Sequence, residues 1–174
     1  TRTVPTLRLG TDYDLNQRHS IGFLADVSIY NTEDNIRTLA KLVDGNPENS
    51  VAIDAFNNGT SDNQNTTLNL HYLGKLDTLG TTFSADLDYV RLYSQKDATF
   101  LNRVDSLGTP AGISIERLMY DNPTNYDIYS AKADFTKPLG KAGKLELGTK
   151  ASRVVSDNEL KFYEETDGTM LLDD

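Results

Sequence analysis

The stretch SAKADFTKPLGKAGKLELGTK, Ser130–Lys150, predicts two β-strands that meet at a tight turn. Every second residue of the first strand is apolar or small, from Tyr129 to Phe135, and the residues between them are polar. The second strand repeats the pattern, because Leu145 and Leu147 share one face and charged residues occupy the other. This alternation is typical of a sheet with one apolar and one polar face. The function of the chain depends on whether protein or lipid covers the apolar face.

The same alternation recurs along most of the chain. It runs from Pro5 to Ile29 and from Leu68 to Val90, and each stretch is interrupted by one short turn signal. Together with the first hairpin, these stretches predict about six long strands in three hairpins. The expected turns lie near residues 16–20, 77–80 and 137–143, and a further Pro/Gly turn is expected at Thr109–Gly112.

These signals predict an all-β fold, an antiparallel up-and-down meander with short turns at one end and long connections at the other. One segment, Thr32–Gly45, is a candidate helix because its apolar residues keep roughly helical spacing. We expect residues 1–174 to be a single segment of a longer protein.

Composition excludes several kinds of partner and chemistry. The chain has 17 Lys and Arg against 26 Asp and Glu, a net charge of -9, and no cluster of Lys and Arg, which argues against nucleic acid or anionic lipid headgroups as partners. It has no cysteine, and His19 and His71 lie on different strands, so no metal or cofactor is expected. Asp86 and Asp88 lie about 6.6 Å apart on one strand face, but nothing buries them. We therefore expect no enzymatic activity.

The length of the apolar bands indicates whether protein or lipid covers the apolar face. The band from Phe83 to Tyr89 ends at Arg91, and the band that starts at Leu145 ends at Arg153. Such bands match the roughly 9 to 11 residues with which a tilted strand crosses a bilayer. Tyrosines gather where the bands end, as in an interfacial girdle. The pattern predicts a segment of a transmembrane β-barrel, which must close because lipid cannot satisfy a free strand edge.

This interpretation divides the candidate site residues between two faces. The polar residues expected to face the lumen, as structural partners or as a path for solute, are Arg8, Asp12, Asp26, Lys75, Asp86, Asp88, Lys132, Asp134, Glu146 and Lys150. The residues expected in the lipid-facing band are Ile21, Phe23, Val27, Leu68, Leu70, Phe83, Leu87, Phe135, Leu145 and Leu147.

Two other folds fit the alternation. A soluble β-sandwich, as in a cell-surface adhesion or carbohydrate-binding module, would cover the apolar face with a second sheet. It explains the alternation equally well and the equal band lengths only by coincidence. A small self-contained barrel of about eight strands would need two further strands that the pattern does not supply.

Two stretches resemble a known family. LNLHYLGKLDTLGTTFSADLDY and NYDIYSAKADFTKPLGKAGKLELGTKAS are similar to barrel hairpins of TonB-dependent outer-membrane receptors, above all the outer-membrane β-barrel family common in Bacteroidetes. The matching residues are Lys75, Leu76, Asp77, Gly80, Asp86, Asp88 and Tyr89 in the first hairpin, and Lys132, Ala133, Asp134, Pro138, Leu145, Gly148 and Lys150 in the second. The resemblance covers most of residues 60–155 and extends more loosely to Leu7–Tyr30.

The resemblance implies a barrel of about 22 strands with an N-terminal plug and a TonB box, in the outer membrane of a Gram-negative bacterium. Such a receptor imports a scarce nutrient with energy from TonB. This sequence shows neither plug nor TonB box, so its expected partners are outer-membrane lipid, the rest of the barrel and plug, the TonB system through the missing N-terminal part, and an unidentified nutrient. Ligand contacts are expected in long loops around Asn57–Asn65 and Asp97–Thr109, and the isolated chain is expected to self-associate.

Overall fold

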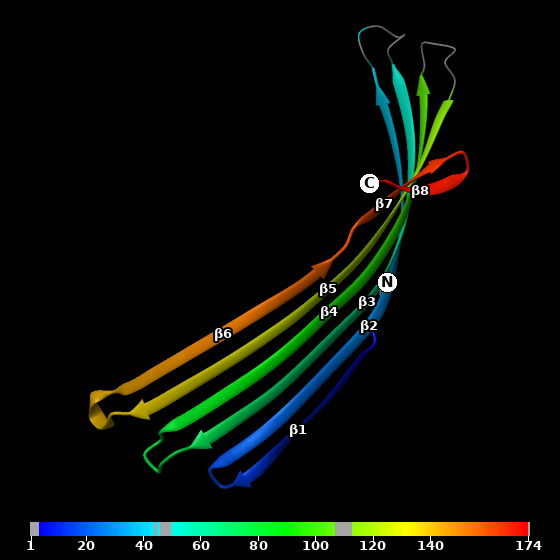
Figure 1. The fold of residues 1–174 in the computed structure, drawn as a ribbon. Coiled ribbons are helices and arrows are strands. Elements are labelled where there is room, and N and C mark those ends of the chain that lie inside the picture. The colour runs from blue at the N-terminus through cyan, green and yellow to red at the C-terminus, as the bar shows by residue number, and fades with distance from the viewer. Residues whose placement is uncertain (1–3, 44, 46–49, 107–112, 174) are drawn as a thin grey trace. The chain divides into compact units, whose positions relative to one another are not determined.

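The computed structural model describes residues 4–43, 45, 50–106 and 113–173 (Figure 1). Nearly all of them lie in β-strands. The strands are β1 (Thr6–Asn16), β2 (His19–Leu42), β3 (Val51–Lys75), β4 (Thr82–Ser106), β5 (Ile113–Pro138), β6 (Lys144–Asn158), β7 (Lys161–Thr166) and β8 (Thr169–Asp173). One short 3-10 helix, η2 (Gly140–Ala142), lies between β5 and β6. Within these residues, no helix is long and apolar enough to cross a membrane.

The strands form one eight-stranded antiparallel meander in the order β1-β2-β3-β4-β5-β7-β8, with β6 also paired to β5. The predicted fold class is therefore confirmed. Strands β6 and β7 share the same partner strand, since Leu118–Asp121 of β5 pairs with Lys161–Glu164 of β7. Between β6 and β7, the Glu159 N–H donates to the Pro123 carbonyl oxygen at 3.2 Å, so the chain stays beside β5.

The three short turns lie where the sequence predicts them. At the β1–β2 turn, Asn16 Oδ1 accepts hydrogen bonds from the backbone N–H of Arg18 at 2.8 Å and of His19 at 3.1 Å. The β3–β4 turn contains Gly80 at φ 98°, in the left-handed region that glycine tolerates best. The β5–β6 turn is built around η2 and is closed by a 2.8 Å hydrogen bond from Leu139 N to Gly143 O.

The structure contradicts one local prediction, and another lies outside the described residues. The candidate helix at Thr32–Gly45 is wrong, because β2 continues to Leu42. Cross-strand contacts hold this part of β2 beside β3: Thr32 Oγ1 lies 2.9 Å from Ser61 Oγ, and Arg37 pairs with Asp54. Such pairing outweighs the weak helical spacing of three apolar residues. The turn predicted at Thr109–Gly112 lies outside the described residues.

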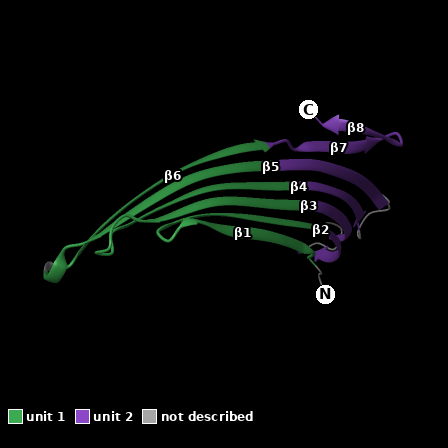
Figure 2. Ribbon diagram, turned by 90° about the horizontal axis from the view of Figure 1, so that it is seen from below, with its two compact units in different colours: residues 1–30, 63–93, 125–157 green, residues 31–62, 94–124, 158–174 purple. Residues whose placement is uncertain are grey.

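The chain divides into two compact units, which Figure 2 colours separately. Unit 1 comprises Thr1–Tyr30, Asn63–Tyr93 and Asn125–Asp157, and includes the three short turns. Unit 2 comprises Asn31–Asp62, Ser94–Thr124 and Asn158–Asp174. Both units take segments from several strands. That the whole chain is one barrel segment stays a prediction.

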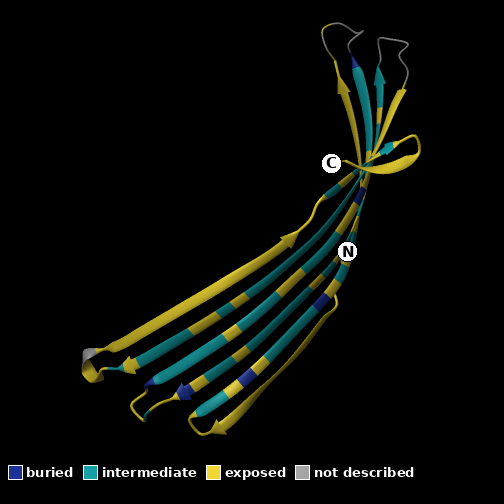
Figure 3. Ribbon diagram, in the orientation of Figure 1, coloured by how far each residue is buried: buried dark blue, intermediate teal, exposed yellow. Residues whose placement is uncertain are grey.

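The described residues enclose almost no hydrophobic core. Ala98 is their one buried apolar residue, and none of their large side chains is fully buried. Strands β1 and β6 are exposed along their whole length (Figure 3). Large apolar side chains stay open to the surroundings, as with Leu87 at 54% and Leu147 at 59% exposure. A lone sheet cannot bury this apolar surface by itself, so lipid or other protein must cover it.

Candidate functional site

In unit 1 the residues of the two predicted sets lie on opposite faces. Strand β1 pairs with β2 so that Arg8 lies opposite Asp26 and Thr11 lies opposite Phe23. Directly opposed residues share a face, and neighbours along a strand alternate between faces. The register thus gathers Arg8, Asp12 and Asp26 on one face, here called the polar face. It places Ile21, Phe23 and Val27 on the other, the apolar face.

A glycine in strand β2 lets polar side chains of β1 and β3 meet across that strand. His71 Nε2 on β3 lies 2.7 Å from Asp12 Oδ1 on β1, although β2 runs between these strands. Gly22 occupies the crossing point, where an added Cβ would lie 2.1 Å from Asp12 Oδ1 and 2.2 Å from His71 Nε2. Only a residue without a side chain therefore permits this contact.

From His71 the hydrogen bonds continue to β5. His71 Nδ1 lies 2.9 Å from Asn69 Oδ1, and Asn69 Nδ2 donates to Asp88 Oδ1 at 2.7 Å. Ser130 Oγ donates to Asp88 Oδ2 at 3.0 Å. We call Asp12, His71, Asn69, Asp88 and Ser130 the transverse polar chain, since it links β1, β3, β4 and β5.

The donors and acceptors of the transverse polar chain fix one another. Asn69 gives its NH₂ group to the Asp88 carboxylate, so it presents its carbonyl oxygen to His71. That oxygen and the Asp12 carboxylate both accept hydrogen bonds. The His71 ring therefore lies between two acceptors, the Asp12 carboxylate and the Asn69 carbonyl oxygen.

The remaining predicted polar residues either form ion pairs within one strand or between neighbouring strands, or have no side-chain partner among the described residues. Arg8 Nε lies 2.8 Å from Asp26 Oδ2 across strands. Lys132 pairs with Asp134 at 2.5 Å within β5, and Lys144 pairs with Glu146 at 2.6 Å within β6. Asp86 lies in β4 and shares the polar face with Asp88, two residues along the strand. Lys75 and Lys150 have no side-chain partner in the part of the chain that the structure describes.

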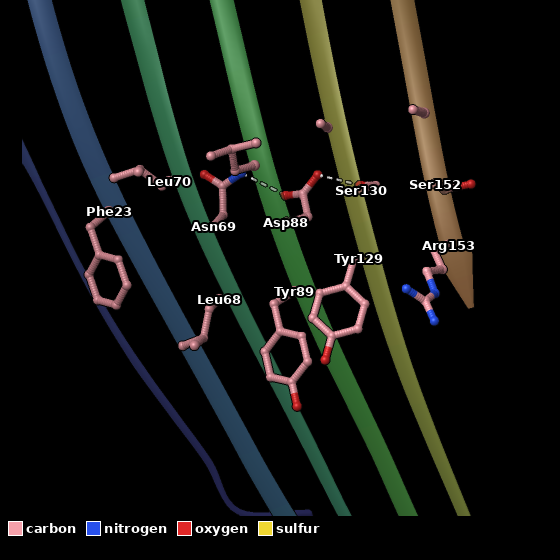
Figure 4. A pocket seen from close by; sticks show the side chains of 13 residues that line it. Phe23, Leu68, Asn69, Leu70, Asp88, Tyr89, Tyr129, Ser130, Ser152 and Arg153 are labelled. Atoms are coloured by element: carbon pink, nitrogen blue, oxygen red, sulfur yellow. Dashed lines mark hydrogen bonds between the residues drawn. The ribbon is translucent and has the colours of Figure 1, made fainter. Parts of the chain in front are cut away.

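The predicted lipid-facing residues are half-buried or exposed, and none is buried. Four of them, Phe23, Leu68, Leu70 and Leu87, line a hollow of about 540 Å³ (Figure 4). At one end of the hollow, the Tyr89 and Tyr129 rings lie 5.1 Å apart and Arg153 follows on β6. That these residues face lipid, and that the polar face meets a lumen, stays a prediction.

Tyrosines and polar side chains form a cluster where the apolar face ends away from the short turns. Tyr89 Oη donates to Asp127 Oδ1 at 2.6 Å, and Asn125 Nδ2 donates to Asp127 Oδ2 at 3.2 Å. Arg91 Nε donates to Asn125 Oδ1 at 3.2 Å. Tyrosines with polar neighbours at the end of an apolar band are typical of a membrane interface.

A second aromatic group lies toward the short turns, on the apolar face. Tyr72 Oη lies 2.6 Å from His19 Nδ1, the two rings stack at 5.9 Å, and Phe83 lies 6.2 Å from Tyr72. The Tyr72 hydroxyl covers Gly74, where an added Cβ would lie 2.6 Å from it. The sequence did not predict this role of His19, although its alternation with Ile21 places it on this face.

Unit 2 contains an ion pair between strands β2 and β3. Arg37 forms two hydrogen bonds to Asp54, Nε to Oδ1 at 2.9 Å and Nη2 to Oδ2 at 2.8 Å, and its guanidinium lies 4.8 Å from the centre of the Phe56 ring. The hydrogen bond from Arg37 lowers the pKa of Asp54, and the same bond raises the pKa of Arg37. The two stretches predicted to contact a ligand are not loops where the structure describes them, because Asn57–Asn65 lies within β3 and residues 97–106 lie within β4. Residues 107–109 of the second stretch lie outside the described residues.

Comparison with known proteins now defines the class of protein. Residues 74–174, more than half of the chain, match the outer membrane protein beta-barrel family. The chain belongs to this family. It is therefore part of the barrel wall of an outer-membrane protein of a Gram-negative bacterium, as the sequence predicts.

Other comparisons add little. No curated protein matches the chain. Among solved structures, it is similar to the membrane pore complex of pneumolysin seen by cryo-electron microscopy, at 9% identity and a TM-score of 0.16, over 93% of this chain and 31% of that chain. A likeness at this TM-score carries no argument. The chain spans less than a third of that protein.

Proposed function

We propose that the chain is a segment of the barrel wall of a TonB-dependent receptor for nutrient binding and uptake, of the kind common in Bacteroidetes. The observation that carries the proposal is a sheet with two unlike faces and almost no core of its own. Its apolar face suits lipid, and its polar face suits a lumen filled by a plug and water. The two hairpins at residues 68–89 and 125–152 resemble those of such receptors.

In this proposal the polar face serves structure first and transport second. The transverse polar chain ties four strands together, which stiffens the wall on the side where a plug would lie. Unpaired Lys75 and Lys150 remain available for hydrogen bonds to a plug or a passing solute. The protein moves its ligand and does not transform it, so we propose no enzymatic activity. The energy comes from TonB acting on a plug in the N-terminal part of the whole protein.

The soluble β-sandwich is not proposed. It would need a second sheet against the apolar face, and the described strands form one sheet. It would also need a buried apolar core, which these residues lack apart from Ala98. A self-contained barrel is not proposed either, because β7 and β8 are short and the strand order begins at β1 and ends at β8.

A genetic epistasis experiment tests the proposal. Strains that lack this protein, TonB or both are grown on minimal medium across a panel of sole nutrient sources and iron carriers. We expect loss of this protein to abolish growth on at least one scarce nutrient, and the double deletion to grow no worse than the TonB deletion. Growth of the double deletion on that nutrient that is clearly worse than growth of the TonB deletion alone would overturn TonB dependence. Complementation with the wild-type protein controls for secondary mutations.

A further inference from the structure

We propose that one face of unit 2 binds an organic cation, a solute with an ammonium or guanidinium group. Three aromatic rings, those of Phe100, Tyr120 and Phe162, form the site together with the Glu164 carboxylate beside them. We call the three rings the aromatic row. The inference rests on the proposed function in nutrient binding, and it names the chemical class of the nutrient.

The aromatic row crosses three neighbouring strands, β4, β5 and β7, within unit 2 (Figure 2). The Phe100 ring lies 5.8 Å from the Tyr120 ring and is tilted by 37° to it, and the Phe162 ring lies 6.3 Å from Tyr120 at 67°. Tyr120 lies directly opposite Phe162 in the sheet, so both side chains share one face. Phe162 is 48% exposed, and the other two rings are half-buried. A solute can therefore reach the rings.

A carboxylate stands among apolar side chains beside the aromatic row. Glu164 lies directly opposite Leu118 of β5 and Leu171 of β8, and it follows Phe162 by two residues on the same face of β7. It is exposed, and no side chain in the described part of the chain forms a hydrogen bond or ion pair with it. A lone charge on apolar surface gains from a counter-charge outside the protein.

The charges around the aromatic row favour a cation over an anion. Asp173 of β8 lies directly opposite Phe162, and Glu116 shares the face of β5 that carries the row. Lys96 is the basic residue on this face of β4 among the described residues of unit 2. It lies four residues from Phe100, or about 13 Å along the strand. A cationic solute would therefore be attracted to the row and an anionic one repelled.

Rings and a carboxylate together suit an organic cation better than a metal ion. An aromatic ring attracts a cation placed over its face within about 6 Å, and the apolar part of the solute can lie on Leu118 and Leu171. Unit 2 already contains such an arrangement, because the Arg37 guanidinium lies 4.8 Å from the centre of the Phe56 ring and also binds Asp54. The described residues include no group of three or more side chains that could hold a metal ion.

The aromatic row lies where an entering solute would pass in the proposed barrel. Phe100 and Tyr120 have the same parity on β4 and β5 as Asp88 and Ser130, which the proposed function turns toward the lumen. Unit 2 contains the strand segments away from the short turns. In outer-membrane barrels the short turns lie in the periplasm, so these segments would lie toward the outside. The row would then bind a solute before it reaches the plug.

Ligand-detected NMR titration of the whole protein in detergent tests the proposal. The probes are choline, its uncharged isostere with carbon in place of nitrogen, N-acetylarginine methyl ester, and the citrulline analogue, in which urea replaces guanidinium. We expect at least one cation to bind roughly tenfold more tightly than its neutral partner, as for an interaction with a charged group. Glu164→Gln should remove this preference. Glu165→Gln is the matched control, because it removes the same charge from the other face of β7, and it should leave the preference unchanged.

A second pair of variants addresses the rings. Phe162→Leu keeps an apolar side chain but removes the ring, and it should weaken binding of the preferred cation about threefold or more. Phe56→Leu removes a ring from the other face and should have no effect. Circular dichroism verifies that each variant is folded.

Equal affinity for each cation and its neutral partner, or a preference that survives Glu164→Gln, would overturn the proposed site. Binding that Phe162→Leu leaves unchanged would overturn the role of the aromatic row. The growth experiment with TonB deletions fails or succeeds separately. A cation preference without TonB dependence would overturn the proposed function alone, and TonB-dependent growth without a cation preference would overturn the site alone.

Discussion

Replacing Gly22 by alanine should break the contact between Asp12 and His71. A Cβ at this position would lie 2.1 Å from Asp12 Oδ1 and 2.2 Å from His71 Nε2, so at least one side chain must leave. The contact is partly exposed to solvent, with 37% of the His71 side chain and 75% of the Asp12 side chain accessible. Solvent exposure limits the value of such a pair to about 0.5–1 kcal/mol.

A matched control corrects for the intrinsic effect of alanine. In a strand interior, alanine is favoured over glycine by roughly 0.5–1 kcal/mol. Gly59→Ala in β3 should show that gain alone, because its added Cβ meets no atom closer than 3.8 Å. Gly22→Ala should therefore be about 1 kcal/mol less favourable than Gly59→Ala in free energy of unfolding.

The assay is guanidinium unfolding of the protein folded in lipid vesicles, repeated in a His71→Ala background. Without the imidazole, the added methyl group meets only the Asp12 side chain, which can rotate into solvent. The gap between the Gly22→Ala and Gly59→Ala variants should then shrink by at least half. An unchanged gap in that background, or no gap in the wild type, would refute the transverse polar chain as a stabilising feature.

The other predictions concern the turn, the ion pair of unit 2 and self-association. The pKa of Asp77 is lowered by hydrogen bonds from the Thr81 hydroxyl at 2.5 Å and from the backbone N–H groups of Thr81 and Leu79. These bonds stabilise the fold at neutral pH, and the stabilisation is lost as pH falls through the lowered pKa. Between about pH 6 and 2, where carboxyl groups titrate, the free energy of unfolding should therefore fall less steeply in Asp77→Ala than in wild type, and equal slopes would contradict this. Arg37→Ala should raise the pKa of Asp54 toward its usual value, because the hydrogen bond from Arg37 lowers it, and NMR titration can measure this change. An unmoved Asp54 pKa would contradict the pairing. The chain purified without detergent should form larger species as its concentration rises in a light-scattering dilution series, whereas a stable monomer would show that the apolar face is covered from within.

Much of the fold follows from local signals in the sequence. The alternation around Leu68–Gly74 fixes which residues share a face, since strand periodicity is two. The turn at Asp77–Gly80 is predictable because the aspartate side chain can accept backbone hydrogen bonds and the glycine can adopt positive φ. Both features depend on residues close together in the sequence.

The features that the sequence did not predict depend on pairing between distant strands. The stretch Thr32–Leu42 has ambiguous spacing, and only its pairing with β3 makes it a strand. The contact of Asp12 with His71 requires the registers of β1, β2 and β3 together, with Gly22 between them. The signal that could have revealed it is a glycine on the polar face of β2, opposite Asp12. That signal has meaning only once the register is known.

In the proposed function, one face of this wall meets lipid and the other meets water. The chain contains no cysteine, so single cysteines can be introduced along β4 without background labelling. In the outer membrane, cysteines at Phe83, Ala85 and Leu87 should react with a membrane-embedded probe, and those at Ser84, Asp86 and Asp88 with a small water-soluble reagent. Labelling of both sets by the water-soluble reagent, or protection of the first set from both probes, would contradict the account.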